Sequence, residues 1–201
     1  MLADFPADTL TETIAGFHDT KARFAAFEKA VEEDVCGRAA GVQQEIRFIK
    51  DRYDVACVLG DLLEAGELPL RVTHNDTKSN NVLMDNTTGK GLCVIDLDTV
   101  MPGLAVNDFG DSIRFGASTG AEDEKDLSKI SCDMELYDIY AKGFVEGCGG
   151  ALTDMEIECL PIGAKVMTYE CGMRFLTDYL SGDTYFKVDY PTHNLDRTRT
   201  Q

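Results

Sequence analysis

The segment THNDTKSNNVLMD, residues 73–85, crowds a histidine, two aspartates, a lysine and three asparagines around a short apolar run. In phosphoryl transfer the protein mainly positions the nucleophile and neutralises charge, and an aspartate that accepts the proton of the attacking hydroxyl recurs. Asp76 is therefore a candidate base. Lys78 can offer its ammonium to the transferring phosphate. The residue types of this segment thus indicate phosphoryl-transfer chemistry.

A predicted hairpin follows this segment and carries further oxygen ligands. The apolar runs VLMD (82–85) and LCVI (92–95) flank a turn-forming NTTGKG. If the two arms pair symmetrically, Asn81 faces Asp96, with Cβ atoms about 5 Å apart. An amide oxygen and a carboxylate suit Mg²⁺, which takes one or two protein carboxylates and substrate phosphates. Asp98, two residues later and expected on the same strand face, is an alternative ligand.

Each of these residues alone has an ordinary structural explanation. A loop Asp commonly forms a turn, an Asn before a strand commonly bonds its own backbone, and a Lys beside them is commonly solvated. The combination is more specific: His-x-Asp, an Asn five residues after that Asp, and a hairpin ending in Ile-Asp. This order is typical of the catalytic and metal-binding loops of the kinase superfamily.

Further motifs extend the pattern over nearly the whole chain: FHDT, HNDTKSNNVL, VIDLDTVMPG, RFLTDYLSGDTYF and HNLDRTRTQ. Together they resemble the aminoglycoside phosphotransferase family of small-molecule kinases, which has a protein-kinase-like fold, and most of all the N-acetylhexosamine 1-kinases within it. The resemblance implies ATP- and Mg²⁺-dependent phosphorylation of the anomeric hydroxyl of an N-acetylhexosamine. Alternatives are another acceptor, such as choline, an aminoglycoside or a different sugar, and a non-catalytic module that binds a sugar or a partner protein.

The same resemblance implies roles for the loop residues. Asp76 would be the catalytic base at the sugar hydroxyl, and Asn81 and Asp96 the magnesium ligands. Lys78 stands where protein kinases have a lysine and many antibiotic phosphotransferases a histidine, so it would contact a phosphate of ATP. His74 would pack beneath the loop as a structural residue.

Three more residues receive roles from the resemblance. Asp108, in NDFGD, would open the next helix and hydrogen-bond the catalytic loop. Arg174 and Tyr185 would lie near the sugar, since Arg offers several donors and Tyr a hydroxyl and a ring face. Arg174 could instead form surface salt bridges with Glu170 and Asp178, each four residues away on a helix.

Helical patterns dominate the elements that must position these residues. The expected helices run from Asp19 or Thr20 to about 33, from Gly41 past Ile49 and on to Leu62 with a stop at Gly66, from 133 to 146, and from Thr153 past Pro161 to about Leu180. The fold class expected is mostly helical α+β, a kinase-like C-terminal lobe with a small hairpin. The seven scattered cysteines are expected to be reduced thiols.

The chain, residues 1–201, is expected to be one domain. It shows no Gly-rich nucleotide loop, and only about 73 helical residues precede the catalytic loop. We therefore expect the catalytic and acceptor lobe of a kinase, truncated at both ends, with the N-terminal nucleotide lobe absent and an apolar inter-lobe surface that favours self-association.

The overall charge narrows the partners. Nineteen Lys and Arg against 36 Asp and Glu give a formal net charge of -17, which repels nucleic acid and anionic lipid. The sequence shows neither a signal-peptide pattern nor a run of about 20 apolar residues. We expect a cytoplasmic protein that acts on a small molecule.

Overall fold

Helices form most of the structure, a computed structural model that describes residues 5–201. The elements are α1 (Thr20–Glu33), α2 (Gln43–Lys50), α3 (Tyr53–Glu64), β1 (Arg71–Thr73), β2 (Val82–Met84), β3 (Gly91–Val94), β4 (Met101–Gly103), α4 (Ala105–Gly116), α5 (Met134–Gly147), α6 (Asp154–Leu180) and α7 (His193–Thr200). Short 3-10 turns lie between several of them. The expected mostly helical α+β class is confirmed.

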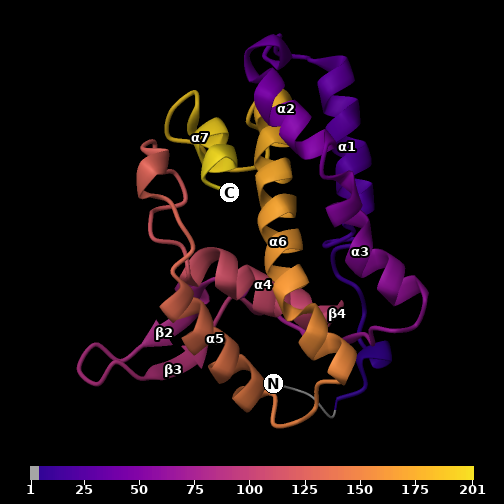
Figure 1. Cartoon of the computed structure of the whole chain (residues 1–201), viewed down its shortest axis with the longest axis vertical. Coiled ribbons are helices and arrows are strands. Elements are labelled where there is room, and N and C mark those ends of the chain that lie inside the picture. The colour runs from indigo at the N-terminus through magenta and orange to yellow at the C-terminus, as the bar shows by residue number, and fades with distance from the viewer. Residues whose placement is uncertain (1–4) are drawn as a thin grey trace.

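The long helix α6 runs through the middle of the molecule, with α1, α2 and α3 along one side and α7 beside its C-terminal half (Figure 1). Its start is the predicted capping box: Thr153 Oγ1 accepts from the Glu156 N–H, and the Glu156 carboxylate accepts from the Thr153 N–H. Pro161 lies inside α6 and does not end it. Two apolar clusters line this helix, one against α1 and α2, the other against α3 and α4.

Helices α4 and α6 cross at two glycines. A Cβ at Gly163 would lie 2.2 Å from the Val106 carbonyl oxygen, and one at Gly110 would lie 2.3 Å from the Gly163 carbonyl oxygen. No side chain fits between the two backbones at this point. The close approach fixes α4 on α6, and α4 in turn carries Asp108 toward the loop that follows β1.

The first three helices follow the sequence prediction with one refinement. Asp19 caps α1 by accepting from the Ala22 N–H, and Phe24 and Phe27 are buried on one face. The helical pattern after Gly41 forms two helices instead of one. Where the two helices meet, the Phe48 carbonyl accepts from the Arg52 guanidinium and not from the Arg52 backbone N–H. The guanidinium also stacks on the Phe48 ring.

The expected stop after α3 is present. Gly66 has φ +74, a left-handed conformation that costs glycine little. Its N–H donates to the Leu63 carbonyl, and the next N–H, of Glu67, donates to the Leu62 carbonyl. This is the Schellman pattern that commonly ends a helix.

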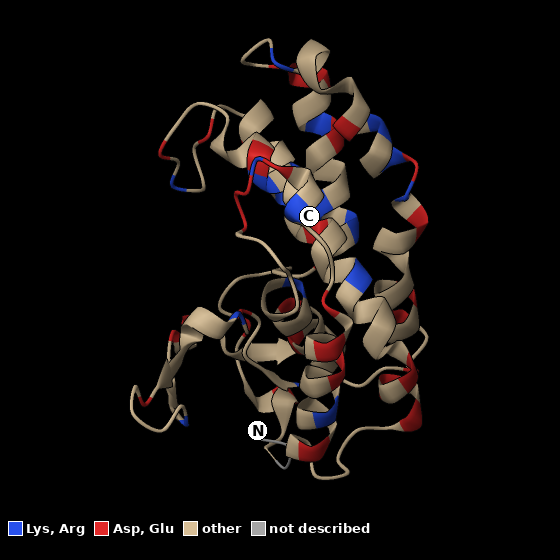
Figure 2. Cartoon of the chain, turned by 60° about the vertical axis from the view of Figure 1, so that its left-hand side comes forward, with Lys and Arg blue, Asp and Glu red and all other residues tan. Residues whose placement is uncertain are grey.

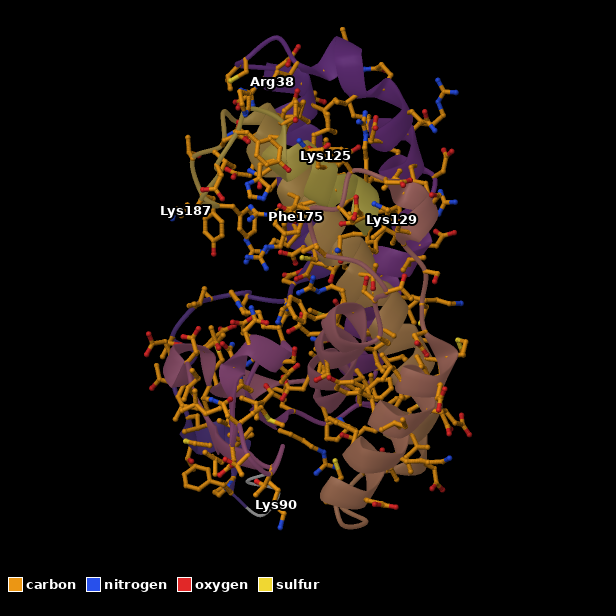
Figure 3. All side chains as sticks on the ribbon, turned by 90° about the vertical axis from the view of Figure 1, so that its left-hand side faces the viewer. Arg38, Lys90, Lys125, Lys129, Phe175 and Lys187 are labelled. Carbon is orange, nitrogen blue, oxygen red and sulfur yellow. The ribbon has the colours of Figure 1, made fainter. Side chains whose placement is uncertain are left out.

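Two small antiparallel sheets complete the fold. β1 pairs with β4, with Thr73 opposite Met101 and Arg71 opposite Gly103. β2 and β3 form the predicted hairpin, which projects from the helices (Figure 1). Lys90, near its tip, lies at the opposite end of the molecule from Arg38 (Figure 3). The sequence did not indicate β4, because its Met-Pro-Gly segment carries no alternating apolar pattern.

Acidic residues lie along most of the helices (Figure 2). Within residues 5–201, no helix is both long and apolar enough to cross a bilayer. The seven cysteines all lie in this range, and none forms a disulfide.

Candidate active site

Asp108 holds the loop that follows β1. It lies in the first turn of α4, where Oδ2 accepts from the His74 N–H at 2.8 Å and Oδ1 from the Asn75 N–H at 2.7 Å. Its own carbonyl accepts from Thr77 Oγ1. Burial raises the pKa of Asp108 to about 6. The two N–H donors act in the opposite direction, because they favour the ionised carboxylate. This geometry matches the loop-holding position expected for Asp108.

Asn75 sets the turn of the loop. Its φ is +65, a left-handed value that Asn adopts more readily than most residues. Its side chain accepts from Thr73 Oγ1 and donates to the Thr99 carbonyl, so it ties β1 to the turn before β4. A Cβ at Gly103 would lie 2.6 Å from the Asn75 amide oxygen, so β4 packs directly on this network.

His74 lies between the loop and the end of the hairpin. Nε2 is 2.9 Å from the Ile95 carbonyl, which can only accept, and Nδ1 is 3.3 Å from the Asp76 N–H, which can only donate. The two contacts fix the orientation of the ring between the loop and the end of the hairpin. The structural role of His74 stays a prediction.

Asp76, Lys78 and Asn81 converge on one another. Lys78 Nζ lies 2.8 Å from Asp76 Oδ2, and the Asn81 amide nitrogen lies 2.8 Å from the same carboxylate oxygen and 2.8 Å from the Asp76 carbonyl. Asn81 is 5% exposed, and no described residue donates to its amide oxygen. The structure therefore brings together the three loop residues to which the sequence assigned chemistry.

The predicted pairing of Asn81 with Asp96 is wrong by one residue. Val82 pairs with Val94, and the Ile95 N–H donates to the Asn81 carbonyl, so Asn81 faces Ile95. The turn is tighter than the sequence suggested: the Asp85 N–H donates to the Lys90 carbonyl, and Met84 pairs with Gly91. The irregularity between Leu83 and Met84 recovers one residue of this shift and leaves Asn81 opposite Ile95.

Asp96 follows at φ 62, ψ 55, and its side chain is exposed. Asp98 lies in the 3-10 turn Leu97–Thr99, so the expectation that it shares a strand face with Asp96 is also wrong. The strand ends at Val94, and the alternation of side chains ends with it.

Asn81 and Asp96 carry the types of oxygen atom that a magnesium ion takes as ligands. The described residues hold no cluster of three His, Cys, Asp or Glu side chains suited to a metal, but Mg²⁺ usually takes only one or two carboxylates and keeps several waters. The Asn81 amide oxygen has no hydrogen bond from the described residues, and Asp96 is exposed. Both are the hard oxygen ligands that Mg²⁺ prefers.

Arg174 and Tyr185, far apart from this loop in sequence, line one small cavity of about 230 Å³. The Arg174 guanidinium is 3.4 Å from the Tyr185 hydroxyl and faces the rings of Phe17, Tyr185 and Phe186 at 5.4–5.7 Å. Arg23, which the sequence analysis did not select, lines the same cavity. Burial, and then the charge of Arg174, lower the pKa of Arg23.

The alternative role for Arg174, salt bridges to Glu170 and Asp178, is not what the structure shows. Asp178 accepts from the backbone N–H groups of the loop that carries Tyr185, and from the Asn194 amide. Glu170 binds His18 and Thr20. Among residues 5–201, no carboxylate lies within ion-pair distance of Arg174, so its guanidinium is available to a ligand.

His18 links the two regions and was missed by the sequence analysis. Nδ1 lies 2.8 Å from Glu170 Oε1 on α6, and Nε2 lies 3.0 Å from the Asn75 carbonyl in the loop. Glu170 is one helical turn before Arg174, and Phe17 precedes His18 under the Arg174 guanidinium. The FHDT motif was the available signal, but nothing in the sequence indicates which carboxylate His18 meets.

Comparison with known families agrees with this geometry. Residues 5–140 match the APH phosphotransferase enzyme family, which is more than half of the chain. The matched range contains the Asp76 loop, the hairpin and Asp108, and it ends before Arg174 and Tyr185. The match therefore supports a kinase-like phosphotransferase and says nothing about the acceptor. On this evidence the chain belongs to the phosphotransferase enzyme family.

Proposed function

We propose that this protein transfers the γ-phosphoryl group of MgATP to the anomeric hydroxyl of an N-acetylhexosamine. The observation that carries the proposal is the Asp76 carboxylate, held by Asn81 and Lys78 at 2.8 Å each on a loop that Asp108 fixes to α4. A positioned carboxylate beside a lysine and an amide oxygen is the arrangement that phosphoryl transfer to an alcohol requires.

In this mechanism Asp76 accepts the proton of the anomeric hydroxyl while the hydroxyl oxygen attacks the γ-phosphorus and ADP leaves. Lys78 exchanges its contact with Asp76 for the phosphoryl oxygens, where its charge opposes the charge that develops. Asn81 and Asp96 are the residues assigned to magnesium, which when bound neutralises charge on the phosphates. Asp108 and His74 keep the loop in place without touching substrate.

The cavity beside Arg174 supports a sugar as the acceptor. Arg174 offers donors to hydroxyl or acetamide oxygens, and the exposed Tyr185 ring offers an apolar face for stacking. Arg23 adds a second guanidinium, and Asp178 is occupied by backbone N–H groups. Two guanidinium groups against the single carboxylate of Asp178 leave an excess of positive charge in the cavity lining, which disfavours cationic acceptors such as choline and aminoglycosides.

The proposal assigns to this chain the catalytic and acceptor part of a kinase. Among residues 5–201 the strands form only two two-stranded sheets, and the sequence contains no Gly-rich nucleotide loop. The base, the predicted magnesium ligands and the acceptor cavity all lie within the described residues. Sugar binding is therefore a property that this chain can be tested for directly.

Isothermal titration calorimetry with N-acetylglucosamine, N-acetylgalactosamine and choline tests the acceptor. We expect one of the two sugars to bind and choline not to bind. Arg174→Gln should weaken sugar binding about 10-fold or more, because it removes charge-assisted hydrogen bonds. Arg47→Gln is a matched control, since Arg47 is exposed and its side chain makes no hydrogen bond or ion pair with the described residues. Preferential binding of choline, or unchanged sugar affinity in Arg174→Gln, would contradict the proposal.

A further inference from the structure

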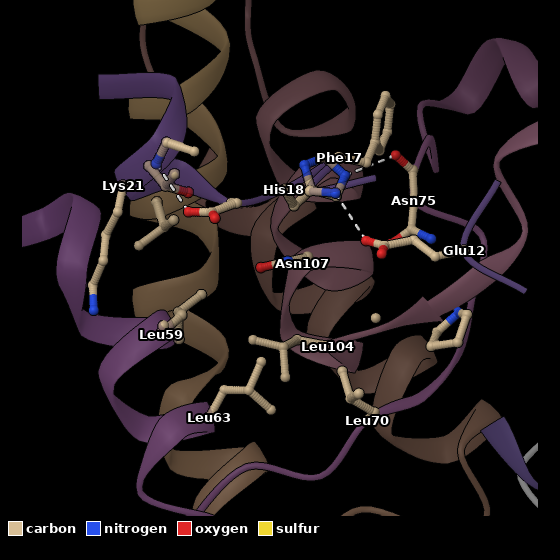
Figure 4. A pocket seen from close by; sticks show the side chains of 18 of the residues that line it. Glu12, Phe17, His18, Lys21, Leu59, Leu63, Leu70, Asn75, Leu104 and Asn107 are labelled. Carbon is tan, nitrogen blue, oxygen red and sulfur yellow. Dashed lines mark hydrogen bonds between the residues drawn. The ribbon is translucent and has the colours of Figure 1, made fainter. Parts of the chain in front are cut away.

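A second, larger cavity of about 380 Å³ lies beside His18 (Figure 4). It is enclosed by the segment before and at the start of α1, by α3, by β4 and by the first turn of α4. No role in the proposed reaction is assigned to it. Its volume is well above the roughly 150 Å³ that suffices to hold a benzene molecule in an apolar protein cavity.

Apolar side chains form much of the wall. They come from α3, β4 and α6 and from the residues just before β1 and α4: Leu59, Leu63, Leu70, Met101, Leu104 and Val166. Leu59 and Leu104 belong to the buried core, whereas Leu70 is half exposed at the edge. The cavity therefore offers an apolar bed of the kind that ligand sites present, with a few polar groups around it.

Asn107 is the unusual polar group in this wall. It is 6% exposed, its amide oxygen is buried, and neither end of the amide makes a hydrogen bond with the described residues. Exchanging the amide oxygen and nitrogen would not change this, because both ends lack a partner. In Figure 4 the Asn107 side chain points into the cavity, above Leu59 and Leu63. Buried polar groups are nearly always paired, so an unpaired one in a cavity indicates a missing partner.

The other polar groups of the wall already have partners. Lys21 Nζ binds Asp61 at 2.6 Å and Glu64 at 3.1 Å, and Glu12 accepts from the Gly16 N–H at 2.8 Å. Lys21 is the only Lys or Arg in the wall, whereas Glu12, Asp19 and Glu64 all line it. The excess of carboxylates opposes an anionic ligand.

We propose that this cavity binds a small amphipathic molecule, neutral or singly cationic, that carries a hydrogen-bond donor on an apolar body. The body lies on Leu59, Leu63 and Leu104, and the O–H or N–H donates to the Asn107 amide oxygen once the amide turns that oxygen from its buried position towards the cavity. This site is separate from the acceptor cavity and does not depend on which acceptor the protein uses.

The cavity shares residues with the catalytic loop, so a ligand bound in it affects the environment of the loop. His18 and Asn75 line the cavity, and Asn75 immediately precedes Asp76. On α4, Asn107 faces the cavity while the next residue, Asp108, holds the loop. Occupancy should therefore shift the backbone amide resonances of Asn75 and Asp76, which makes the loop a reporter for the site.

Four probes of one shape test the proposal: benzyl alcohol, benzylamine, toluene and benzoate. They are titrated into the ¹⁵N-labelled protein, and amide shifts give affinities. We expect benzyl alcohol, benzylamine or both to bind more tightly than toluene, and benzoate not to bind. Asn107→Leu, close in size, should weaken the alcohol and the amine about 3- to 10-fold and leave toluene unchanged or tighter. The affinities of benzyl alcohol and benzylamine, compared with each other, show whether the cavity prefers a neutral or a cationic ligand.

A second variant blocks the cavity itself. Gly60 lines it on α3, and a Cβ there would make ordinary contact with Lys21 Cε at 3.5 Å, so Gly60→Leu should fold and prevent binding of all four probes. Gly143→Leu is the matched control, because Gly143 lies on α5 with no atom within 4 Å of its added Cβ. Equal binding by the wild type and Gly60→Leu, no probe binding at millimolar concentration, or no effect of Asn107→Leu would overturn the proposal.

Discussion

His18 and Glu170, 152 residues apart, form a buried hydrogen-bonded pair with 2.8 Å between Nδ1 and Oε1. The other ring nitrogen faces the Asn75 carbonyl at 3.0 Å, so both nitrogens of His18 meet groups that can only accept. Burial alone would lower the pKa of His18, but the hydrogen bond and charge of Glu170 outweigh it and raise that pKa above its usual 6.5. The pair thus joins α6 to the catalytic loop through an imidazolium.

This pair makes stability depend on pH. A histidine whose pKa is raised by folding stabilises the fold below its unfolded value near 6.5, and the contribution disappears as the pH rises through the folded pKa. Burial would raise the pKa of Glu170, but His18 and Thr20 outweigh it and lower that pKa. The contribution of Glu170 to stability therefore disappears as the pH falls below about 4.5 and through the folded pKa.

We therefore expect His18→Gln to lower the free energy of unfolding by about 3–5 kcal/mol at pH 6, because it leaves a buried carboxylate unpaired. The difference from the wild type should shrink at pH values above the folded pKa of His18. Urea unfolding at several pH values, with NMR titration of the imidazole, measures both effects. A His18 ring that titrates at or below 6.5 would contradict the charged pair.

The sequence predicted what is local and missed what is long-range. The Thr153 capping box, the Asp19 cap and the contiguous set Asp76, Lys78 and Asn81 were predictable, because a few neighbouring residues determine them. The hairpin was predicted but not its register, because the turn closes with Met84 opposite Gly91 and a bulge beside it recovers only part of this shift, which leaves Asn81 opposite Ile95.

Contacts between distant segments left no comparable signal. The partners of His18 lie 57 and 152 residues away, and nothing in the chain near His18 identifies them. Arg23 reaches the acceptor cavity only because α1 packs against α6. The Asn107 amide is an unremarkable polar residue in the sequence, and only packing reveals that it is buried and unpaired.

The α4–α6 crossing predicts a severe effect of a single methyl group. In Gly163→Ala the new Cβ would lie 2.2 Å from the Val106 carbonyl oxygen, and backbone cannot move aside as a flexible side chain can. We expect a loss of about 1–3 kcal/mol or more in the free energy of unfolding. Gly143→Ala, with open space at its Cβ, should stabilise by about 0.5–1 kcal/mol through helix propensity. Equal stability of the two variants in urea denaturation would show that α4 can shift freely on α6.

Magnesium dependence distinguishes the two aspartates after the hairpin. Asp96→Ala should raise the magnesium concentration for half-maximal turnover at least about 10-fold. Replacing a residue that only hydrogen-bonds a metal ligand already lowers metal affinity by about this factor. Asp98→Ala should change it little, since Asp98 lies in the following 3-10 turn. Turnover measured against Mg²⁺ concentration checks the order, and a larger effect of Asp98→Ala would reverse the ligand assignment.

Exposed apolar side chains on the hairpin lead us to expect self-association. Five apolar side chains on it and just after it are about half exposed or more: Leu83, Met84, Leu92, Val94 and Leu97. Exposed apolar side chains favour association, so we propose that the chain forms concentration-dependent dimers through the hairpin. Light scattering coupled to size exclusion should show a smaller mass for Leu92→Lys, whereas Ile139→Lys, an equally simple change at an exposed site on α5, should not alter it. A wild type that stays monomeric at all concentrations would disprove this.

Phosphorus NMR of a reaction with MgATP and an N-acetylhexosamine tests the proposed function most directly. The proposal predicts a new phosphate ester at C1 of the sugar, no ester with the methyl glycoside, whose anomeric oxygen carries a methyl group, and turnover lowered by about 10²–10⁴ in Asp76→Asn. Asp138→Asn, at an exposed ion pair on α5, should behave as the wild type. An ester at another hydroxyl, sugar bound with ATP left intact, or undiminished turnover in Asp76→Asn would contradict it.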